Sequence, residues 1–198
     1  MFTGIIQAVG RVADVRPAGQ SAALTIDAGG LDMGDVAVGD SIACNGVCLT
    51  VTSLVPHGFT LDVSQETLRV TTGFTAGSAI NLEKSLRLAD RLGGHLVSGH
   101  VDGAGTVTAV VPEGDNRELI VRFPAELGRY IARKGSISIN GVSLTVNVVT
   151  ADSFSVNLIP HTLAVTNLKE LKQGDKVNLE IDLVARYVER MFDRDDQR

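Results

Sequence analysis

One stretch of the sequence occurs twice, as SIACNGVCLTV from Ser41 to Val51 and as SISINGVSLTV from Ser136 to Val146. The copies lie 95 residues apart and agree at eight of eleven positions. Each contains Asn-Gly, the preferred pair for a two-residue type I′ turn, because that turn needs positive φ at both positions. The stretch therefore predicts a β-hairpin, and its recurrence predicts two similar domains in tandem.

The rest of the chain has the pattern of short strands. Runs of Val, Ile and Leu are broken by Gly, Asn and Asp at intervals of roughly 8 to 12 residues, which is typical of all-β proteins. In the first copy we expect strands at 5–15, 22–26, 41–54, 59–63 and 79–82. Closing a sheet removes edges that would otherwise pair with another chain. We therefore predict an all-β protein of two tandem homologous six-stranded Greek-key barrels plus a C-terminal amphipathic α-helix.

The repeat also sets the expected domains. The stretch 85–94 is the least repeat-like and is expected to link barrels of residues 1–94 and 95–182. In the third part, residues 183–198, apolar side chains recur at helical spacing, and Asp182 is placed to cap the helix. Its apolar face either packs against its own barrel or makes an oligomer contact, which we favour because the first copy has no such helix. The apolar positions are Leu183, Val184, Tyr187, Val188, Met191 and Phe192.

Composition narrows the class of ligand. The net charge of −5, without a basic cluster, argues against nucleic acid or anionic lipid as partners. No apolar run approaches the roughly 20 residues of a membrane span, so we expect a cytoplasmic protein with no membrane partner. The two cysteines, Cys44 and Cys48, indicate neither a disulfide framework nor a metal site. A neutral or small polar ligand is favoured.

The hairpin turn fixes which side chains share a face. With Asn45 and Gly46 in the turn, residue 44 opposes 47 and residue 43 opposes 48. Cys44 then lies on an apolar core face, whereas Cys48 lies on the other face, either in a ligand site or as an inert thiol. That other face is small and hydrogen-bonding in both copies, which suits the wall of a polar site. It carries Ser41, Ala43, Cys48 and Thr50, matched by Ser136, Ser138, Ser143 and Thr145.

Five motifs in order complete a family pattern over essentially the whole chain. They are MFTGIIQ from Met1, NGVCLTV from Asn45, ETLR from Glu66, GGHLVSGH from Gly93, and SLTV from Ser143 with IPHTL from Ile159. Each is weak alone, but together and within an internal duplication they are specific. The chain resembles the riboflavin synthase family of the α-chain type.

The resemblance implies a transferase that works without a cofactor or a metal. In the last step of riboflavin biosynthesis, one 6,7-dimethyl-8-ribityllumazine donates a four-carbon unit to a second. The products are riboflavin and 5-amino-6-ribitylaminopyrimidinedione. Two related barrels would each bind one lumazine. The family also implies a homotrimer, in which the first barrel of one subunit meets the second barrel of a neighbour, and it leaves an association with lumazine synthase open.

The family's lumazine-binding residues carry over onto two matching pockets. One lumazine would lie against Cys48, Leu49, Thr50, Asp62, Val63, Ser64, Gln65, Glu66 and Thr67, closed by Gly99, His100 and Val101 of another chain. The second would lie against Ser143, Leu144, Thr145, Ile159, Pro160, His161, Thr162, Leu163 and Ala164, with Lys134 nearby, closed by Gly4, Ile5 and Ile6 of another chain. Asp182 resembles a family position near the site or is only a helix cap.

Four residues are candidates for catalysis: His100, Cys48, Ser41 and Phe2. Histidine ordinarily titrates near neutral pH, so His100 suits the transfer of a proton from the acidic C7 methyl of one lumazine. Cys48 either attacks C7 of the other lumazine or polarises its ring, with Ser41 or water as competing nucleophiles. Phe2 is either needed for activity, as in the family, or simply packs. His95, beside two glycines, is expected to be structural.

Two other kinds of protein remain as alternatives. A non-catalytic lumazine- or flavin-binding antenna protein of the same ancestry would keep the barrels and lose site residues, but Cys48, His100, Ser41 and Phe2 are all present. A flavin-dependent reductase would need a nucleotide-binding α/β domain with a glycine-rich phosphate loop, and the sequence shows neither. We therefore expect the enzyme.

Overall fold

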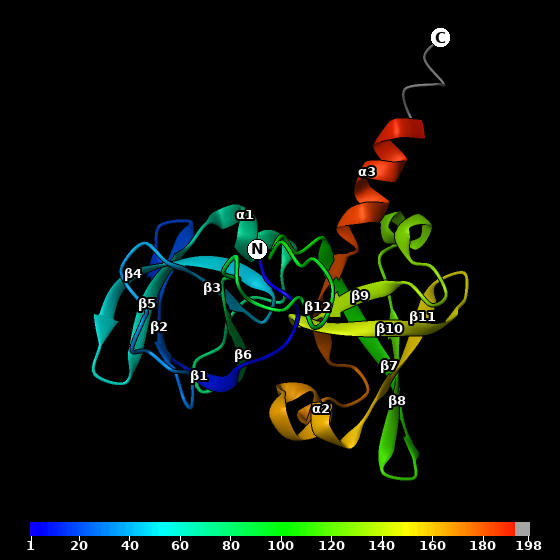
Figure 1. Ribbon diagram of the computed structural model, residues 1–198, viewed down its shortest axis with the longest axis horizontal. Coiled ribbons are helices and arrows are strands. Elements are labelled where there is room, and N and C mark those ends of the chain that lie inside the picture. Colours follow the sequence, from blue (N-terminus) through cyan, green and yellow to red (C-terminus); the bar gives the residue numbers. More distant parts are fainter. Residues whose placement is uncertain (193–198) are drawn as a thin grey trace.

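The structure, a computed structural model, consists of two barrels lying side by side, and it describes residues 1–192 (Figure 1). The first barrel closes in the order β1-β2-β5-β4-β3-β6. A short helix, α1 (Gln65–Val70), lies between β5 and β6 in the sequence. The strands are β1 (Ala8–Ala18), β2 (Ser21–Asp27), β3 (Ser41–Cys44), β4 (Val47–Val55), β5 (Gly58–Val63) and β6 (Ala79–Lys84).

The second barrel repeats this arrangement, in the closed order β10-β11-β8-β7-β12-β9. In both barrels strands that are not consecutive in the sequence lie side by side, such as β2 with β5 and β8 with β11, as predicted for Greek-key barrels. Its strands are β7 (Gly103–Glu113), β8 (Asn116–Arg122), β9 (Ser136–Ile139), β10 (Val142–Val149), β11 (Ser153–Leu158) and β12 (Lys176–Ile181). Its short helices are η1 (Ala125–Tyr130), α2 (Pro160–Val165) and η2 (Asn167–Glu170).

The repeated hairpins have the predicted register. Cys44 pairs with Val47 and Ala43 with Cys48, and φ is 49° at Asn45 and 79° at Gly46. The second hairpin has the same form, with φ of 47° and 82° at its turn. One face of each hairpin enters the core of its barrel, so each barrel has an apolar cluster of its own. The predicted alternation of faces is therefore confirmed.

The first strand begins later than the sequence suggested. We expected a strand from residue 5, but β1 starts at Ala8. The residues before it leave the first barrel to reach the second, where the carbonyl of Gly4 accepts a hydrogen bond from the N–H of Ser143 at 2.8 Å. A contact between barrels thus replaces strand pairing at this end of the chain.

The two hairpin turns meet each other between the barrels. A Cβ built on Gly46 would lie 2.7 Å from the backbone nitrogen of Gly141, and the reverse contact is the same length. Asparagines surround this contact. Asn81 Nδ2 donates to the carbonyl of Asn140, and Asn178 Nδ2 donates to the carbonyl of Asn45, both at 2.9 Å. The turns are thus satisfied by partners from the opposite barrel.

The C-terminal helix, α3 (Leu183–Phe192), begins where the apolar spacing predicted. Asp182 caps it, since its Oδ1 accepts the N–H of Val184 at 3.0 Å. The helix projects away from both barrels (Figure 1), and its apolar side chains are exposed, Tyr187 by 65% and Met191 by 73%. Its apolar face therefore does not pack against its own barrel, whereas its polar side contacts the second barrel through Arg186 with Asp102 and Glu189 with Arg129. Residues 193–198 of the predicted third part, 183–198, lie outside the described residues.

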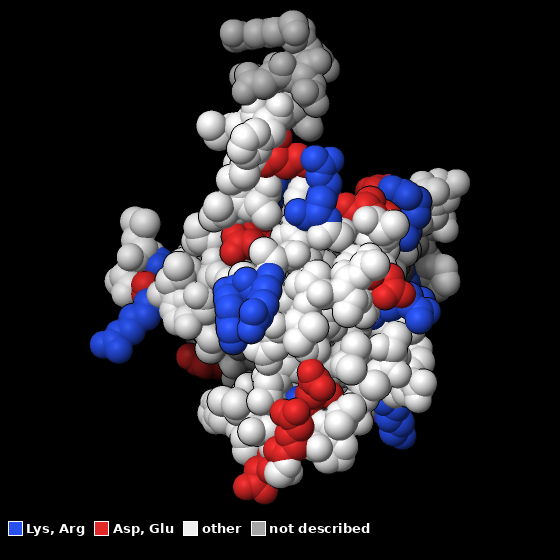
Figure 2. Space-filling model, turned by 90° about the vertical axis from the view of Figure 1, so that its right-hand side faces the viewer, with Lys and Arg blue, Asp and Glu red and all other residues white. Residues whose placement is uncertain are grey.

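The rest of the surface carries charges of both signs. On the side shown in Figure 2, lysine and arginine side chains are interspersed with aspartate and glutamate. Within residues 1–192 no helix is long and apolar enough to cross a membrane. The stretch 85–94 contains neither helix nor strand.

We predict that Gly46→Ala lowers the free energy of unfolding by about 2–4 kcal/mol. A left-handed alanine costs roughly 1–2 kcal/mol, and the new methyl would also strike Gly141. Gly19→Ala is the matched control, because its φ of 66° is also positive but nothing lies within 4 Å of the added Cβ. Urea unfolding of both variants measures the difference. Equal losses would contradict a role for the contact between turns.

Candidate active site

Cys48 lies beside a segment that comes from the second barrel. Its N–H donates to the carbonyl of Gly99 at 2.9 Å. A Cβ on Gly99 would lie 2.5 Å from the Cβ of Cys48, and φ at Gly99 is 80°, so only glycine fits here. His100 follows and is exposed, and Val101 packs against the core of the first barrel. The structure thus places Gly99 against Cys48, with the exposed His100 as the next residue along the chain.

The second hairpin makes the equivalent contact. The N–H of Ser143 donates to Gly4, and a Cβ on Gly4 would lie 2.5 Å from the Cβ of Ser143. Ile5 is 49% exposed at the position that His100 occupies in the other copy, and Ile6 packs against the second core. Two half-sites of the same construction result, with different side chains.

Both crossings take place within one chain. The segment 99–101 lies on the first hairpin of its own chain, and 4–6 on the second. The expectation that these segments close the pockets from another chain is therefore corrected. The two barrels share the turn contact and the asparagine network, and this brings each segment onto the opposite hairpin.

Short helices follow β5 and β11, the strands that pair with the hairpin strands β4 and β10. Ser64 caps α1 by accepting the N–H of Thr67 at 3.2 Å. Arg69 binds the carboxylate of Glu66 at 2.6 Å, which lowers the pKa of that exposed glutamate. Pro160 begins α2, where its missing N–H costs nothing. The exposed members of these predicted stretches are Asp62, Ser64, Gln65, Glu66, Ile159, Pro160, His161 and Ala164.

Three predicted binding residues point their side chains into the cores. Leu49, Val63 and Leu144 belong to the buried clusters, so any contact with a ligand would be through their backbone. Thr50 and Thr145, in contrast, are exposed on the outer face. Other residues of the polar hairpin faces are buried, although the alternation of faces predicted them to be accessible: Ala43 is 3% exposed and Ser138 1%.

Phe2 covers part of the first outer face. It is fully buried, forms a β-bridge with Val97 and packs against Ala43 and Cys48. Ala43 is consequently 3% exposed. Phe2 therefore supports the wall beneath Cys48. Cys44 lies on the core face, where burial raises the pKa of its thiol.

His95, which the sequence predicted to be structural, lies against the second hairpin. Its ring Nδ1 lies 2.7 Å from Oγ of Ser143, and its backbone N–H donates to the carbonyl of Thr3 at 3.1 Å. Burial lowers the pKa of His95, and the charge of Asp182 opposes this shift. A helix cap and a buried histidine thus lie close to the Ser143 half-site. The only signal in the sequence was the Gly-Gly-His run, which is equally typical of a structural turn.

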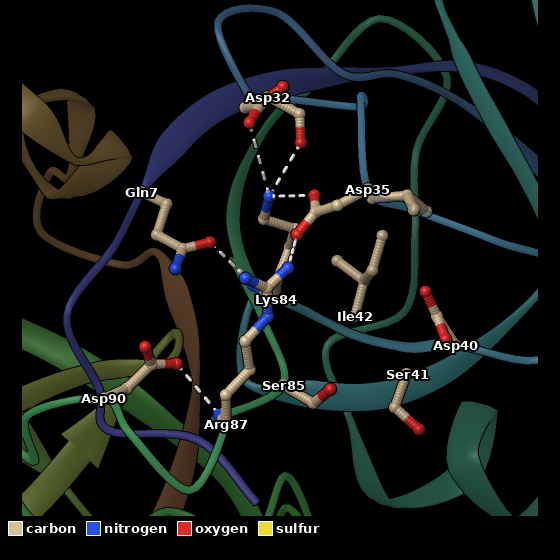
Figure 3. A pocket seen from close by; sticks show the side chains of 11 residues that line it. Gln7, Asp32, Asp35, Asp40, Ser41, Ile42, Lys84, Ser85, Arg87 and Asp90 are labelled. Atoms are coloured by element: carbon tan, nitrogen blue, oxygen red, sulfur yellow. Dashed lines mark hydrogen bonds and ion pairs between the residues drawn. The ribbon is translucent and has the colours of Figure 1, made fainter.

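Ser41 lies at the rim of a recess of about 470 Å³ (Figure 3). Lys84 Nζ lies 2.6 Å from Asp35 Oδ1, and Arg87 also contacts Asp35. Both cations of this recess are paired with Asp35, and its aspartates outnumber them, so the recess is acidic. In Figure 3 the Ser41 hydroxyl points away from these ion pairs.

Lys134 is exposed, with Nζ 3.4 Å from Oδ1 of Asn147 on β10.

Among the described residues, no group of three or more His, Cys, Asp or Glu side chains is arranged to hold a metal ion. Each hairpin face, with Thr50 or Thr145 exposed on it, offers a surface for one side of a planar ligand.

The comparisons with known proteins agree with this geometry. The lumazine binding domain family matches the chain twice, at residues 3–85 and 98–182. Riboflavin synthase of Brucella abortus is 47% identical over 96% of this chain and 98% of its own length. Riboflavin synthase of Bacillus subtilis is 41% identical over 97% and 90%.

Solved structures show the same arrangement of two barrels. LumP complexed with riboflavin has a TM-score of 0.84 at 26% identity, covering 91% of this chain and 99% of LumP. LumP complexed with 6,7-dimethyl-8-(1'-D-ribityl) lumazine has a TM-score of 0.81 at the same identity and coverage. With near full-length relatives above 40% identity and the lumazine binding domain in both halves, the chain belongs to the riboflavin synthase family.

Proposed function

We propose that the two hairpin faces are the lumazine sites at which this chain carries out the riboflavin synthase reaction. The observation that carries the proposal is the matched pair of contacts, Cys48 with Gly99 and Ser143 with Gly4. Two copies of one substrate need two sites of similar shape, and the chain builds its half-sites alike. LumP, a relative in fold, is known in complexes with riboflavin and with the lumazine, which supports the same ligand class here.

The differences between the half-sites divide the work. His100, exposed beside Cys48, takes the proton from the C7 methyl of one lumazine. The carbanion then attacks C6 of the second lumazine, whose C7 has accepted a nucleophile, either the Cys48 thiol, the Ser41 hydroxyl or water. Four carbons pass to the acceptor, which becomes riboflavin, and the donor leaves as the pyrimidinedione. Holding both rings in reacting geometry supplies a further part of the rate, worth about 7–11 kcal/mol in favourable cases.

Other residues of the two walls hold the substrate. Thr50 and Thr145 offer exposed hydroxyls, and the starts of α1 and α2 offer backbone N–H groups beside them. We keep Asp62–Thr67 and Ile159–Ala164 as lumazine-binding stretches, with Lys134 and Asp182 beside the second. Phe2 acts by supporting the Cys48 wall.

A second subunit completes the site. Binding sites ordinarily bury 70–90% of a ligand of this size, whereas each hairpin face is open. We propose that the first barrel of one subunit faces the second barrel of a neighbour in a homotrimer, with the exposed face of α3 packing at its centre. The proposed domains remain 1–94, 95–182 and 183–198, and the proposed location is the cytoplasm. An association with lumazine synthase stays open.

The central prediction concerns turnover. The purified chain should convert 6,7-dimethyl-8-ribityllumazine alone into equal amounts of riboflavin and the pyrimidinedione, measured by absorbance and mass. His100→Ala should lower kcat by about 10²–10⁴-fold because the proton carrier is lost. His57→Ala, an exposed turn residue away from both faces, is the control. Binding without conversion by the parent protein would favour the antenna alternative instead.

A second prediction concerns assembly. Tyr187→Asp with Met191→Asp places two charges on the apolar face of α3 and should shift the trimer to monomers in sedimentation velocity, with a parallel loss of activity. Arg190→Glu, on the exposed polar side of the same helix, is the control. An unchanged sedimentation coefficient in the double variant would remove α3 from the interface.

A third prediction concerns His95 and pH. Because burial lowers its pKa, the folded protein holds His95 neutral, whereas the unfolded chain binds a proton near the ordinary value of about 6.5. This contribution to stability is therefore complete above that value and is lost as the pH falls toward the pKa of the folded state. His95→Asn, which keeps a polar atom toward Ser143, should flatten this part of the curve. The test compares urea unfolding of both proteins between about pH 5 and 8, and parallel curves would contradict it.

A further inference from the structure

Two buried glutamates lie behind the half-sites without belonging to either wall. Glu83 on β6 is 3% exposed and Glu180 on β12 is 2% exposed. Burial raises the pKa of both carboxyl groups, and hydrogen bonds oppose the shift. A buried carboxylate is costly unless its oxygens are satisfied, so the partners of these two show what they are for.

Each glutamate accepts three hydrogen bonds from one short segment. Glu180 Oε1 accepts the N–H and the hydroxyl of Ser98, at 2.6 and 2.7 Å, and Oε2 accepts the N–H of Gly99 at 3.0 Å. Glu83 binds Thr3 and Gly4 in the same way, at 2.7, 2.6 and 3.0 Å. The same three hydrogen bonds occur in both copies, so they are a repeated feature of the fold, and each set is called a clamp below.

The clamped segments are the ones that cross between barrels. The N–H of Gly99 donates to Glu180 of the second barrel, and its carbonyl accepts the N–H of Cys48 of the first. The N–H of Gly4 donates to Glu83 of the first barrel, and its carbonyl accepts the N–H of Ser143 of the second. The lining of each half-site is therefore held by a carboxylate from the opposite barrel.

In each copy one further hydrogen bond links the clamp to the next residue, which is His100 in one copy and Ile5 in the other. The Ser98 hydroxyl donates to Glu180 and accepts the N–H of His100 at 3.3 Å. The Thr3 hydroxyl donates to Glu83 and accepts the N–H of Ile5 at 3.1 Å. Because the carboxylate fixes the direction of the hydroxyl proton, the hydroxyl lone pair is turned toward the next N–H.

We propose that Glu180, acting through Ser98, is a positioning residue that holds His100 against Cys48, with Glu83 and Thr3 as its counterpart for Ile5 against Ser143. Neither glutamate touches substrate. The inference rests on the proposed lumazine sites. It adds that each barrel sets the geometry of the other barrel's site, so a barrel separated from its partner would keep its hairpin face and lose the lining.

The experiment is a double-mutant cycle between Ser98 and His100. Ser98→Ala should lower kcat at least about tenfold with a smaller change in KM, because a proton carrier displaced by about 1 Å loses much of its effect. Ser98→Thr, which reproduces the Thr3 of the first copy, should restore most of the activity. In the double variant Ser98→Ala/His100→Ala the loss should equal that of His100→Ala alone, because Ser98 acts through His100. Glu180→Gln, nearly isosteric, should show the same dependence on His100.

The equivalent pair in the other clamp is the control. Thr3→Ala combined with His100→Ala should lose activity as the product of the two single losses, since Thr3 serves the Ser143 half-site. A kcat of Ser98→Ala equal to the parent, or losses at Ser98 and His100 that multiply, would overturn the proposal.

Binding of riboflavin, followed by fluorescence, separates this proposal from the function itself. If the parent protein forms no riboflavin, the catalytic assignment fails. The clamp is then judged by whether Ser98→Ala weakens riboflavin binding relative to Ser98→Thr. Equal affinities of these two variants would count against it.

Discussion

The contact between the two Asn-Gly turns is the constraint on which the molecule depends. Gly46 and Gly141 approach so closely that neither tolerates a side chain, and amides from the opposite barrel satisfy the turn carbonyls. Asn167 extends the network, since its N–H reaches Asn81 and its Nδ2 reaches Asn45. These bonds join buried amides of opposite barrels, with Asn167 Oδ1 left without a hydrogen-bond partner among the described residues, and so they favour one relative position of the barrels.

That fixed position creates the half-sites. With the turns in contact, the segment before β1 lies on the second hairpin and the segment before β7 lies on the first. Glycine is required where each segment meets its hairpin, because a Cβ at Gly4 or Gly99 would collide with the facing residue. The four motifs MFTGI, NGVCLTV, VSGH and NGVSLTV therefore belong to one structural unit, although they are far apart in the sequence.

The sequence predicted local geometry well and the relation between segments poorly. The turn chemistry of Asn45-Gly46 fixed the hairpin register, and alternation identified the core faces, because both depend on neighbouring residues. The late start of β1, the burial of Ala43 under Phe2 and the bond from His95 to Ser143 all depend on how the barrels dock. No local pattern encodes docking. The resemblance paired the segments at Gly4 and Gly99 with the two hairpins but assigned the crossing to another chain, whereas the structure places it within one.

The duplication also explains how one fold provides two roles for one substrate. The backbone contacts of the two half-sites are equivalent, so both hairpin faces carry the same hydrogen-bonding frame. Substitutions at three points then separate them: Cys48 against Ser143, His100 against Ile5, and the buried His95 at the second site alone. The first of the proposed sites then combines an exposed histidine with a thiol, and the second combines a hydroxyl with a buried histidine 2.7 Å away. We infer that the symmetric backbone frame serves binding and that these few asymmetric side chains distinguish donor from acceptor.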